Sequence, residues 1–312
     1  MLATRFSYTI STMPGQSKSE ITRLLAESGL TPQHRFGQNF LIDLNLLRKL
    51  VTASNLSPAD TVLEVGPGTG SLSEVLLAQG VRLVAVEIDH GLQALLRDRF
   101  RDEPRFTLVQ ADALAGKHQV NPLVLRALDT QPPAAGGAYK LVANLPYQIA
   151  TPLLVDLLMT TPRFDLLACT IQREVGERLA APPRCAAYGP VSVIVQTLAV
   201  TTPLAIIPPS AFWPRPQVES IMLTIQPRPA ADVDVDDIPA FAAFVQHGFQ
   251  QRRKVLRRLL RDWEETAALR AFQHAGVDPG SRAEELTPAQ WRTFFRAVSS
   301  RPAGDALPST DA

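Results

Sequence analysis

The chain has 312 residues, of which 46% are hydrophobic and 20% charged, and its formal net charge is +1. This is the composition of an ordinary globular protein with room for one large or two modest domains. No apolar run of about 18 residues and no N-terminal apolar block occur, so we expect a cytoplasmic protein without membrane spans or a secretory signal. The two cysteines, Cys169 and Cys185, are too few for a disulfide framework, and the scattered histidines predict no metal site.

Residues 1–30 form an extension that precedes the first chemical motif. Its first nineteen residues are rich in Ser and Thr, contain Arg5 and Lys18, and have no acidic residue, which is compatible with an organelle transit peptide. The alternative is a partly disordered extension, which we prefer because "SYTISTMPGQSKS" has no clear apolar face. Met13 is a second possible start of the protein.

Apolar, β-branched segments then alternate with helical patterns. The predicted strands are 61–65, 81–88, 106–111, 139–144 and 164–171, and the predicted helices among them are 71–79, 91–100 and 151–159. Near-continuous apolar strands separated by helices predict a parallel, doubly wound α/β sheet that is covered on both faces. We expect a loop at 116–138 that could include one short helix.

After a helix at 191–198, two further strands are predicted at 199–207 and 218–227, with the loop "PPSAFWPRPQ" between them. Because no helix joins these strands, we expect an antiparallel pair that closes one edge of the sheet. The domain organisation that we predict follows in chain order: extension 1–30, α/β domain 31–228, linker 229–240, small all-helical domain 241–300, and tail 301–312.

The segment "EVGPGTGS" follows the first predicted strand and leads into a helix. Glycines at this place let the backbone turn sharply and approach a ligand, and the helix N-terminus offers unpaired N–H groups. Gly66, Gly68 and Gly70 alternate, which does not match the G-x-G-x-x-G spacing of a dinucleotide fold. The segment therefore predicts a nucleotide-type site other than a dinucleotide site, although a purely structural turn remains the alternative.

Two acidic residues follow the next two predicted strands. Glu87 ends the strand "VRLVAVEI" and could accept hydrogen bonds from both hydroxyls of a ribose. Asp112 follows "FTLVQA" and could accept one from an exocyclic adenine amine. A helix N-cap is the alternative role for such acids, especially for Asp89 and Asp112. Together with the glycine loop, the two acids predict an adenosine site.

The fourth strand runs into "NLPYQIATP". An adenine amine is a poor nucleophile, because its lone pair is delocalised into the ring. The side-chain oxygen of Asn144 and a backbone carbonyl of Leu145 or Pro146 could accept its two hydrogens and orient the lone pair for attack. Tyr147 could stack on the flipped base. A strand-ending turn with a buried tyrosine is the alternative.

This order of motifs resembles the Rossmann-like class I S-adenosylmethionine-dependent methyltransferases, and "NLPY" resembles the motif of those that methylate amines. Five further segments resemble the ribosomal RNA adenine dimethyltransferases, the KsgA family and its relatives, over residues 31–298. They are "QHRFGQNFLID" (33–43), "QREVGERL" (172–179), "AYGPVSVIVQ" (187–196), "PPSAFWPRPQVES" (208–220) and "FQQRRKVLRRLL" (249–260).

The resemblance implies a seven-stranded mixed sheet and dimethylation of the N6 amines of two adjacent adenosines in the 3′-terminal hairpin loop of small-subunit 16S rRNA. It also implies S-adenosyl-L-methionine as cofactor, S-adenosyl-L-homocysteine as product, no metal, and the immature small subunit as partner of a monomeric enzyme. The cofactor contacts that it implies are Asn39, Leu41, Gly66, Glu87, Asp112 and Asn144. The target-amine site would contain Asn144, Pro146, Tyr147 and Phe212, although Phe212 could equally be a core aromatic.

Residues 241–300 contain ten Lys or Arg and six Asp or Glu. A helical projection of "FQQRRKVLRRLLRDW" puts basic residues on one stripe and Val255, Leu256, Leu259 and Leu260 on the other. We expect the basic stripe to bind RNA phosphates, with a solvated helix face as the alternative. Its members are Arg253, Lys254, Arg257, Arg258 and Arg261.

Three other functions remain open at this point. The nearest is an enzyme of the same fold that methylates an adenine of large-subunit rRNA. A second is an assembly factor whose main task is to bind the immature subunit. A nicotinamide oxidoreductase is disfavoured by the spacing of the glycines.

Overall fold

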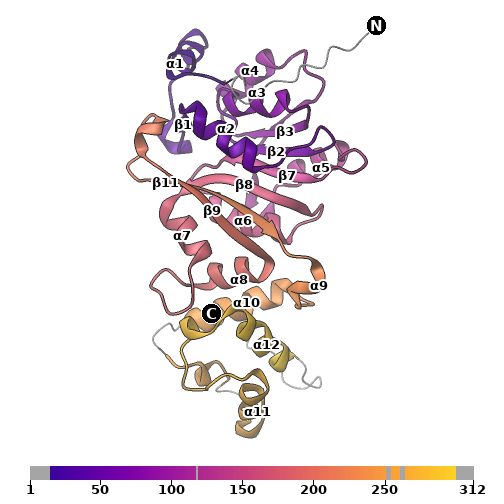
Figure 1. Cartoon of the computed structure of the whole chain (residues 1–312), viewed down its shortest axis with the longest axis vertical. Helices are drawn as coiled ribbons and strands as arrows, with labels where there is room; N and C mark the ends of the chain where they lie inside the picture. Colours follow the sequence, from indigo (N-terminus) through magenta and orange to yellow (C-terminus); the bar gives the residue numbers. More distant parts are fainter. Residues whose placement is uncertain (1–14, 117–118, 251–253, 261–263, 300–312) are drawn as a thin grey trace. The chain divides into compact units, whose positions relative to one another are not determined.

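The computed structural model in Figure 1 describes residues 15–116, 119–250, 254–260 and 264–299. The chain divides into two compact units, one made of Met1–Gly176 with Thr202–Gln226 and the other of Glu177–Thr201 with Pro227–Ala312. No helix in the described ranges has both the length and the apolar character that crossing a membrane requires.

The first unit is built on a seven-stranded sheet with strand order β4-β3-β2-β7-β8-β11-β9. Strands β4, β3, β2, β7 and β8 run parallel, and β11 pairs with β8 in the antiparallel direction, so the sheet is mixed. The predicted strands are confirmed, and β11 and β9 lie at one edge. The bounds are β2 (Thr61–Val65), β3 (Arg82–Glu87), β4 (Phe106–Gln110), β7 (Tyr139–Asn144), β8 (Phe164–Gln172), β9 (Ala199–Ile207) and β11 (Ser220–Pro227).

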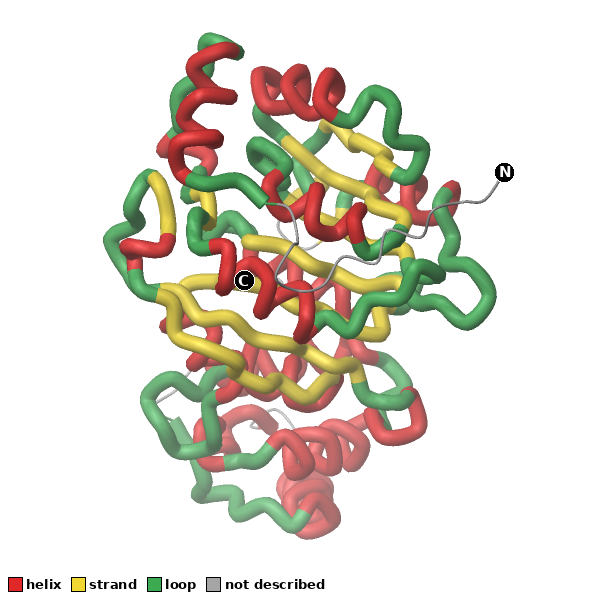
Figure 2. Tube along the Cα trace, turned by 45° about the horizontal axis from the view of Figure 1, so that its top comes forward, coloured by secondary structure: helices red, strands yellow, loops and turns green. Residues whose placement is uncertain are grey.

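Helices lie in front of and behind the strands in Figure 2, which explains why the strands are apolar on both faces. On one face, Val62, Leu83 and Val142 of the sheet form a buried cluster with Leu50 and Leu76 of two helices. Every residue of β2 is buried. The helices of this part are α2 (Leu44–Ala53), α3 (Ser71–Ala78), α4 (His90–Arg99), α5 (Pro122–Thr130), α6 (Ala150–Met159) and α7 (Arg173–Ala180).

Short elements complete the first unit. The segment expected to be a loop contains β5 (Leu114–Gly116) and β6 (Gln119–Val120), which pair with each other, and then α5. A second two-stranded sheet joins β1 (Phe40–Leu41) to β10 (Phe212–Trp213). Two 3₁₀ turns, η2 (His34–Phe36) and η3 (Pro209–Ala211), precede these strands.

Residues 15–30 of the N-terminal extension, which we expect to be partly disordered, lie in the described part of the chain and include a helix. Helix α1 (Lys18–Glu27) begins with a capping box in which Ser17 and Glu20 satisfy each other's backbone N–H groups. Its residues Ile21 and Leu25 are buried, so packing of this apolar pair fixes the helix. Residues 1–14 lie outside the described part of the chain.

The second unit is helical around an aromatic core. The Trp291 ring lies 5.8 Å from the Phe244 ring and 5.7 Å from the Phe249 ring between centroids. A Cβ at Gly248 would lie 2.5 Å from Trp291, so only glycine fits there. The elements are α8 (Pro190–Leu198), α9 (Ala230–Val233), α10 (Ile238–Gln250), η4 (Leu256–Leu260), α11 (Glu265–Ala275), η5 (Ala283–Glu285) and α12 (Pro288–Ser299).

Residues 177–201 belong to this second unit, whereas the sequence-based division puts them in the α/β domain. Tyr188 and Val193 are members of the aromatic core cluster, and the Tyr188 hydroxyl donates to the Leu286 carbonyl at 2.8 Å. These contacts join segments about a hundred residues apart. The functional boundaries of the domains stay a prediction.

Candidate active site

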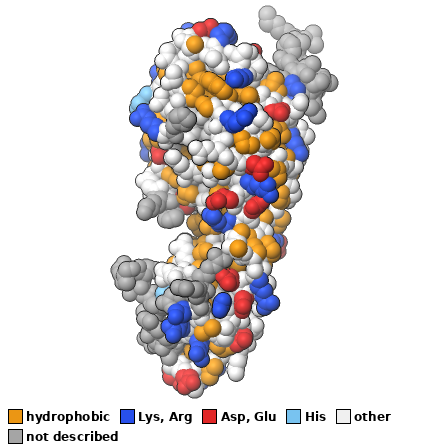
Figure 3. Space-filling view, turned by 90° about the vertical axis from the view of Figure 1, so that its left-hand side faces the viewer, with side chains coloured by type: hydrophobic (Ala, Val, Ile, Leu, Met, Phe, Trp, Pro, Cys, Tyr) orange, Lys and Arg blue, Asp and Glu red, His pale blue; other side chains and the backbone are white. Residues whose placement is uncertain are grey.

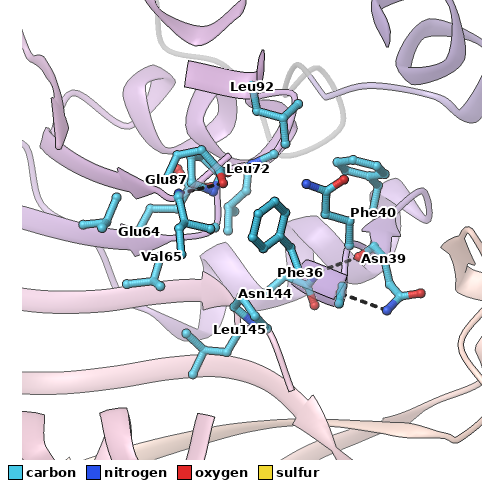
Figure 4. A pocket seen from close by; sticks show the side chains of 18 of the residues that line it. Phe36, Asn39, Phe40, Glu64, Val65, Leu72, Glu87, Leu92, Asn144 and Leu145 are labelled. Carbon is cyan, nitrogen blue, oxygen red and sulfur yellow. Dashed lines mark hydrogen bonds between the residues drawn. The ribbon is translucent and has the colours of Figure 1, made fainter. Parts of the chain in front are cut away.

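The carboxyl ends of β2, β3 and β7, together with the segment after β4, line one pocket in the first unit. Figure 4 shows Glu87 and Asn144 at strand ends, with Phe36, Asn39 and Phe40 lying across the pocket from them. Among the lining residues are all six predicted cofactor contacts and three of the four predicted target-amine residues, with Asn144 in both sets. They are Asn39, Leu41, Gly66, Glu87, Asp112, Asn144, Pro146 and Tyr147.

The glycine loop needs its glycines. Gly66 and Gly68 have φ values of 71° and 61°, in the left-handed region that other residues rarely adopt. A Cβ on Gly68 would lie 2.7 Å from the Phe40 ring, so a side chain there would push Phe40 away. The loop thus forms a tight turn, and its residues also line the pocket. The structural role and the ligand-binding role of the glycines are therefore compatible.

Glu87 is 5% exposed, and its carboxylate is held by three backbone N–H groups. Ile88 and Asp89 donate to one oxygen at 2.9 Å each, and Gly68 donates to the other at 3.3 Å. Burial raises the pKa of Glu87, and the hydrogen bonds from the backbone oppose that rise. The carboxylate is therefore fixed in orientation at the end of β3, beside the glycine loop.

The two aspartates differ in their local roles. Asp89 caps α4, because its Oδ1 accepts from Gly91 at 2.8 Å and Leu92 at 3.2 Å. Asp112 is exposed and caps no helix; its Oδ1 accepts from Leu114 at 3.0 Å in a local turn. The N-cap alternative thus holds for Asp89 and fails for Asp112.

Strand β1 carries Asn39 and Leu41 to the pocket. Leu41 pairs with Phe212 and Phe40 with Trp213, so the "GQNFL" and "AFWP" segments meet although they are far apart in sequence. The Asn39 side chain donates to the Gly37 carbonyl at 3.0 Å. The backbone carbonyl of Asn39 accepts a hydrogen bond from the side-chain nitrogen of Asn144 at 2.9 Å. One contact therefore links the predicted cofactor segment to the predicted amine site.

The side-chain amide of Asn144 is fixed at both ends. Its nitrogen donates to Asn39, and its Oδ1 accepts from the Thr170 hydroxyl. Thr170 lies opposite Asn144 in the register of β8 with β7 and is buried. Sequence reasoning missed Thr170; the available signal was the single hydroxyl in the largely apolar strand "FDLLACTI".

The residues after Asn144 form a turn that leads into α6. The Pro146 carbonyl accepts from Ile149 at 3.2 Å, and Leu145 donates to the Thr170 carbonyl at 3.1 Å. Tyr147 is half-buried, and its hydroxyl makes a 2.7 Å hydrogen bond with the Ser220 hydroxyl. Burial raises the pKa of Tyr147, with the Ser220 bond opposing it, so the ring stays neutral and fixed at the mouth of the site.

Phe212, which we expect to be either a second stacking surface or a core aromatic, is buried. It is 3% exposed and belongs to the buried cluster with Leu41 and Leu47. The described residues that line the pocket do not include it. The core alternative therefore describes Phe212 in this structure, because pairing of β10 with β1 turns its ring into the interior.

Glu64 is a pocket residue that sequence reasoning left without a role. Its Oε2 accepts from the Ser73 hydroxyl at 2.6 Å. Burial raises its pKa to about 8; the Ser73 bond opposes the rise and the nearby Glu87 carboxylate adds to it. The sequence contained one indication of such a role for Glu64, because it is an acidic residue in a buried strand directly before the glycine loop.

The predicted α-helical form of the basic segment is wrong. Residues 256–260 make a 3₁₀ helix, and Val255 forms an isolated β-bridge with Arg282. Lys254, Arg257 and Arg258 are exposed while Leu256 and Leu260 are buried, so the basic and apolar side chains still separate. Arg253 and Arg261 lie outside the described residues.

On the face of the second unit seen in Figure 3, Lys and Arg side chains lie among Asp and Glu side chains. The basic excess of residues 241–300 therefore does not appear there as one uniform patch. The RNA-binding role of the basic residues stays a prediction.

Comparison with known proteins identifies the family. A family model described as "Ribosomal RNA adenine dimethylase" matches residues 29–299. The chain belongs to this family. Ribosomal RNA small subunit methyltransferase A of Anaeromyxobacter dehalogenans is 41% identical over 280 residues, which cover 88% of this chain and 96% of that protein. The protein of the same name from Moorella thermoacetica is 37% identical over 277 residues, 88% of this chain and 95% of that one.

The fold of this dimethylase family member is also found in a solved structure. A dimethyladenosine transferase from Plasmodium falciparum has a TM-score of 0.67 and 20% sequence identity, with coverage of 81% of this chain and 94% of that chain. At that identity the likeness concerns the fold. The resemblance to rRNA adenine dimethyltransferases and the Rossmann-like methyltransferase fold are confirmed.

Membership of this dimethylase family implies S-adenosylmethionine as the methyl donor, and the pocket has the chemistry to hold it. Glu87 offers oriented carboxylate oxygens for ribose hydroxyls, and Ile88 and Ala113 offer apolar surface to a base. The glycine loop leaves room for close approach of the ligand. Among the described residues, no group of three or more His, Cys, Asp or Glu side chains could hold a metal ion.

Proposed function

We propose that this protein dimethylates the N6 amines of two adjacent adenosines in the 3′-terminal hairpin loop of 16S rRNA and thereby acts in small-subunit biogenesis. The observation that supports it most is the single pocket in which Glu87, the glycine loop and Asn144 to Tyr147 meet, in a chain of the rRNA adenine dimethylase family. The relatives at 37% and 41% identity are named as small-subunit enzymes, which favours 16S rRNA over large-subunit rRNA.

The cofactor, when bound, supplies a methyl group on a positively charged sulfur. Glu87 would hold its ribose, Asp112 its adenine amine, and Asn39, Leu41 and Gly66 would form the surrounding walls. Each of these residues lines the pocket. The target base would then enter at the side of the pocket that Asn144 lines.

Asn144 would orient the target amine. Its Oδ1 has two lone pairs, of which Thr170 uses one, so the second can accept an N6 hydrogen. The carbonyl of Leu145 or Pro146 would accept the other hydrogen. With both hydrogens held, the nitrogen lone pair would be free to accept the methyl group that the bound cofactor supplies. The nitrogen would then lose its proton to solvent.

Tyr147 would stack on the flipped adenine. Its ring is held by the bond to Ser220, so it offers a fixed flat surface to the base. A second round at the same amine yields the dimethylated base, and the neighbouring adenosine receives the other two methyl groups.

The RNA would be held by the basic residues of the second unit. Lys254, Arg257 and Arg258 are exposed and available to phosphates. We propose the same role for Arg253 and Arg261, which lie outside the described residues. We further propose that the enzyme works as a monomer in the cytoplasm.

The test is incubation of the protein with methyl-labelled cofactor and under-methylated small subunits, followed by location of the label. We expect two adjacent adenosines near the 3′ end of 16S rRNA to carry dimethyl groups. The variant Asn144→Ala should fold normally and transfer nothing. Label in large-subunit rRNA, or undiminished transfer by Asn144→Ala, would contradict the proposal. If the main function is instead to bind the immature subunit during assembly, small subunits should mature normally in cells that carry the inactive variant Asn144→Ala.

A further inference from the structure

Gln16 is a buried polar residue in the N-terminal extension, 2% exposed, and it contacts the glycine loop. Its side-chain nitrogen donates to the Thr69 carbonyl at 3.1 Å, and its side-chain oxygen accepts from the Thr69 hydroxyl at 2.6 Å. Its backbone N–H donates to the Ser71 hydroxyl at 3.0 Å. Three hydrogen bonds therefore join one residue to a loop more than fifty positions away.

The loop that Gln16 holds is part of the pocket wall. Both Thr69 and Ser71 line the pocket. Thr69 lies between Gly68 and Gly70, which have φ values of 61° and 84°. Glycines give a backbone many accessible conformations, so a loop with two of them needs outside contacts to keep one conformation. The paired bonds to Thr69 provide such a contact.

Helix α1, directly after Gln16, makes a second contact with the pocket. Its buried residues Ile21 and Leu25 form a cluster with Phe40 and Leu92, both of which line the pocket. Figure 4 shows Phe40 and Leu92 at the pocket. The Phe40 ring in turn lies against Gly68. The extension therefore supports the glycine loop through a polar contact and the pocket wall through an apolar one.

We propose that Gln16, Ile21 and Leu25 support the cofactor site, with Gln16 as a positioning residue that holds the glycine loop in its binding conformation. All three precede residues 29–299, to which the family match extends, so the match itself assigns them no role. The inference rests on the proposed use of S-adenosylmethionine in this pocket. Its consequence is that part of the affinity for cofactor is encoded in the extension.

The test uses Gln16→Met in the full chain, which nearly keeps the side-chain volume and removes both bonds to Thr69. The dissociation constant for S-adenosylhomocysteine is measured by calorimetry, and hydrogen exchange of residues 66–71 is followed in the free protein. A hydrogen bond contributes a net of about 1 kcal/mol. Loss of both bonds should therefore raise the dissociation constant by at most roughly 30-fold. We expect weaker binding by about 3- to 30-fold and faster exchange in the loop.

A matched control comes from helix α1, which begins two residues after Gln16. Thr22→Ala removes a polar side chain whose hydroxyl bonds only locally, to the Lys18 carbonyl at 2.9 Å, and should leave the dissociation constant unchanged. The thermal unfolding midpoints of both variants are measured alongside. If Gln16→Met unfolds early, Gln16→Ala is measured below its own unfolding midpoint and provides the same comparison with Thr22→Ala.

A double-mutant cycle separates positioning by Gln16 from direct contact by Thr69. If Gln16 acts through Thr69, then Thr69→Val should weaken binding in the wild type and add little in Gln16→Met. Additive effects, an unchanged dissociation constant in Gln16→Met, or an equal change in Thr22→Ala would each overturn the inference. Failure of the wild-type chain to bind would instead contradict the proposed function. In turnover, the KM for cofactor should rise while kcat stays close to its wild-type value.

Discussion

Replacement of Glu64 by glutamine tests the electrostatics of the pocket. The carboxyl group is buried, which raises its pKa to about 8 from an ordinary value of 4.5, while its bond from Ser73 opposes the rise. The folded chain therefore keeps a proton that the unfolded chain loses between these pH values. Because the folded state binds more protons, the free energy of unfolding falls as pH rises from about 4.5 to about 8.

The size of the effect follows from the same shift. A rise of the pKa to about 8 corresponds to at most about 5 kcal/mol, and entry of water into the open pocket lowers it, so we expect about 2–3 kcal/mol. Glu64→Gln still has an oxygen for the Ser73 bond and cannot ionise. At pH 8.5 the variant should unfold at a temperature higher by roughly 5–10 °C, and at pH 4.5 it should match the wild type.

The assay is thermal unfolding of the cofactor-free protein, followed by circular dichroism from pH 4.5 to 8.5. Glu27→Gln is the matched control, since Glu27 is exposed and pairs only with Arg23 on the same helix. The control should shift the midpoint little at any pH. If Glu64→Gln is less stable than the wild type at pH 8.5, the folded protein favours the ionised carboxylate and the reasoning is refuted.

Three further predictions concern binding and turnover. Thr170→Val removes the hydrogen bond to the Asn144 side chain and should lower the rate of methyl transfer roughly 10- to 100-fold, with little change in cofactor affinity. An unchanged rate in single-turnover assays would contradict this. Glu87→Gln removes a charged acceptor and should weaken cofactor binding roughly 10- to 100-fold by calorimetry; equal binding would exclude the ribose contact. Arg257→Ala with Arg258→Ala should weaken RNA binding and lower the salt slope by about 2; an unchanged slope would argue for a solvated surface.

Local pattern was enough to place most of the catalytic core. Strand β2 (Thr61–Val65) and strand β7 (Tyr139–Asn144) match their predicted ranges, because apolar β-branched runs and the turn residues after them are local features. The carboxyl ends of parallel strands must meet at one edge of a sheet. Glu87, Asn144 and the glycine loop could therefore be assigned to one pocket in advance.

Local pattern was not enough where a partner is distant in sequence. Ile21 and Leu25 of α1 pack with Phe40 and Leu92, and the sequence alone did not predict this helix within the partly disordered extension that we expected. The basic segment has helical periodicity, but Val255 bonds to Arg282 and the chain takes a 3₁₀ form. Phe212 lies in the segment "AFWP", whose sequence does not distinguish a binding residue from a core residue. In the folded chain it pairs with Leu41 and is buried.

By itself, the sequence determined the family, the sheet and the chemical groups of the pocket, since these follow from periodicity, turn residues and motif order. Only the tertiary structure decided how the groups are held. Thr170 orients Asn144 across 26 residues, and Gln16 holds Thr69 across 53. Such hydrogen bonds depend on the meeting of distant segments in the folded chain, and no local periodicity records which segments will meet.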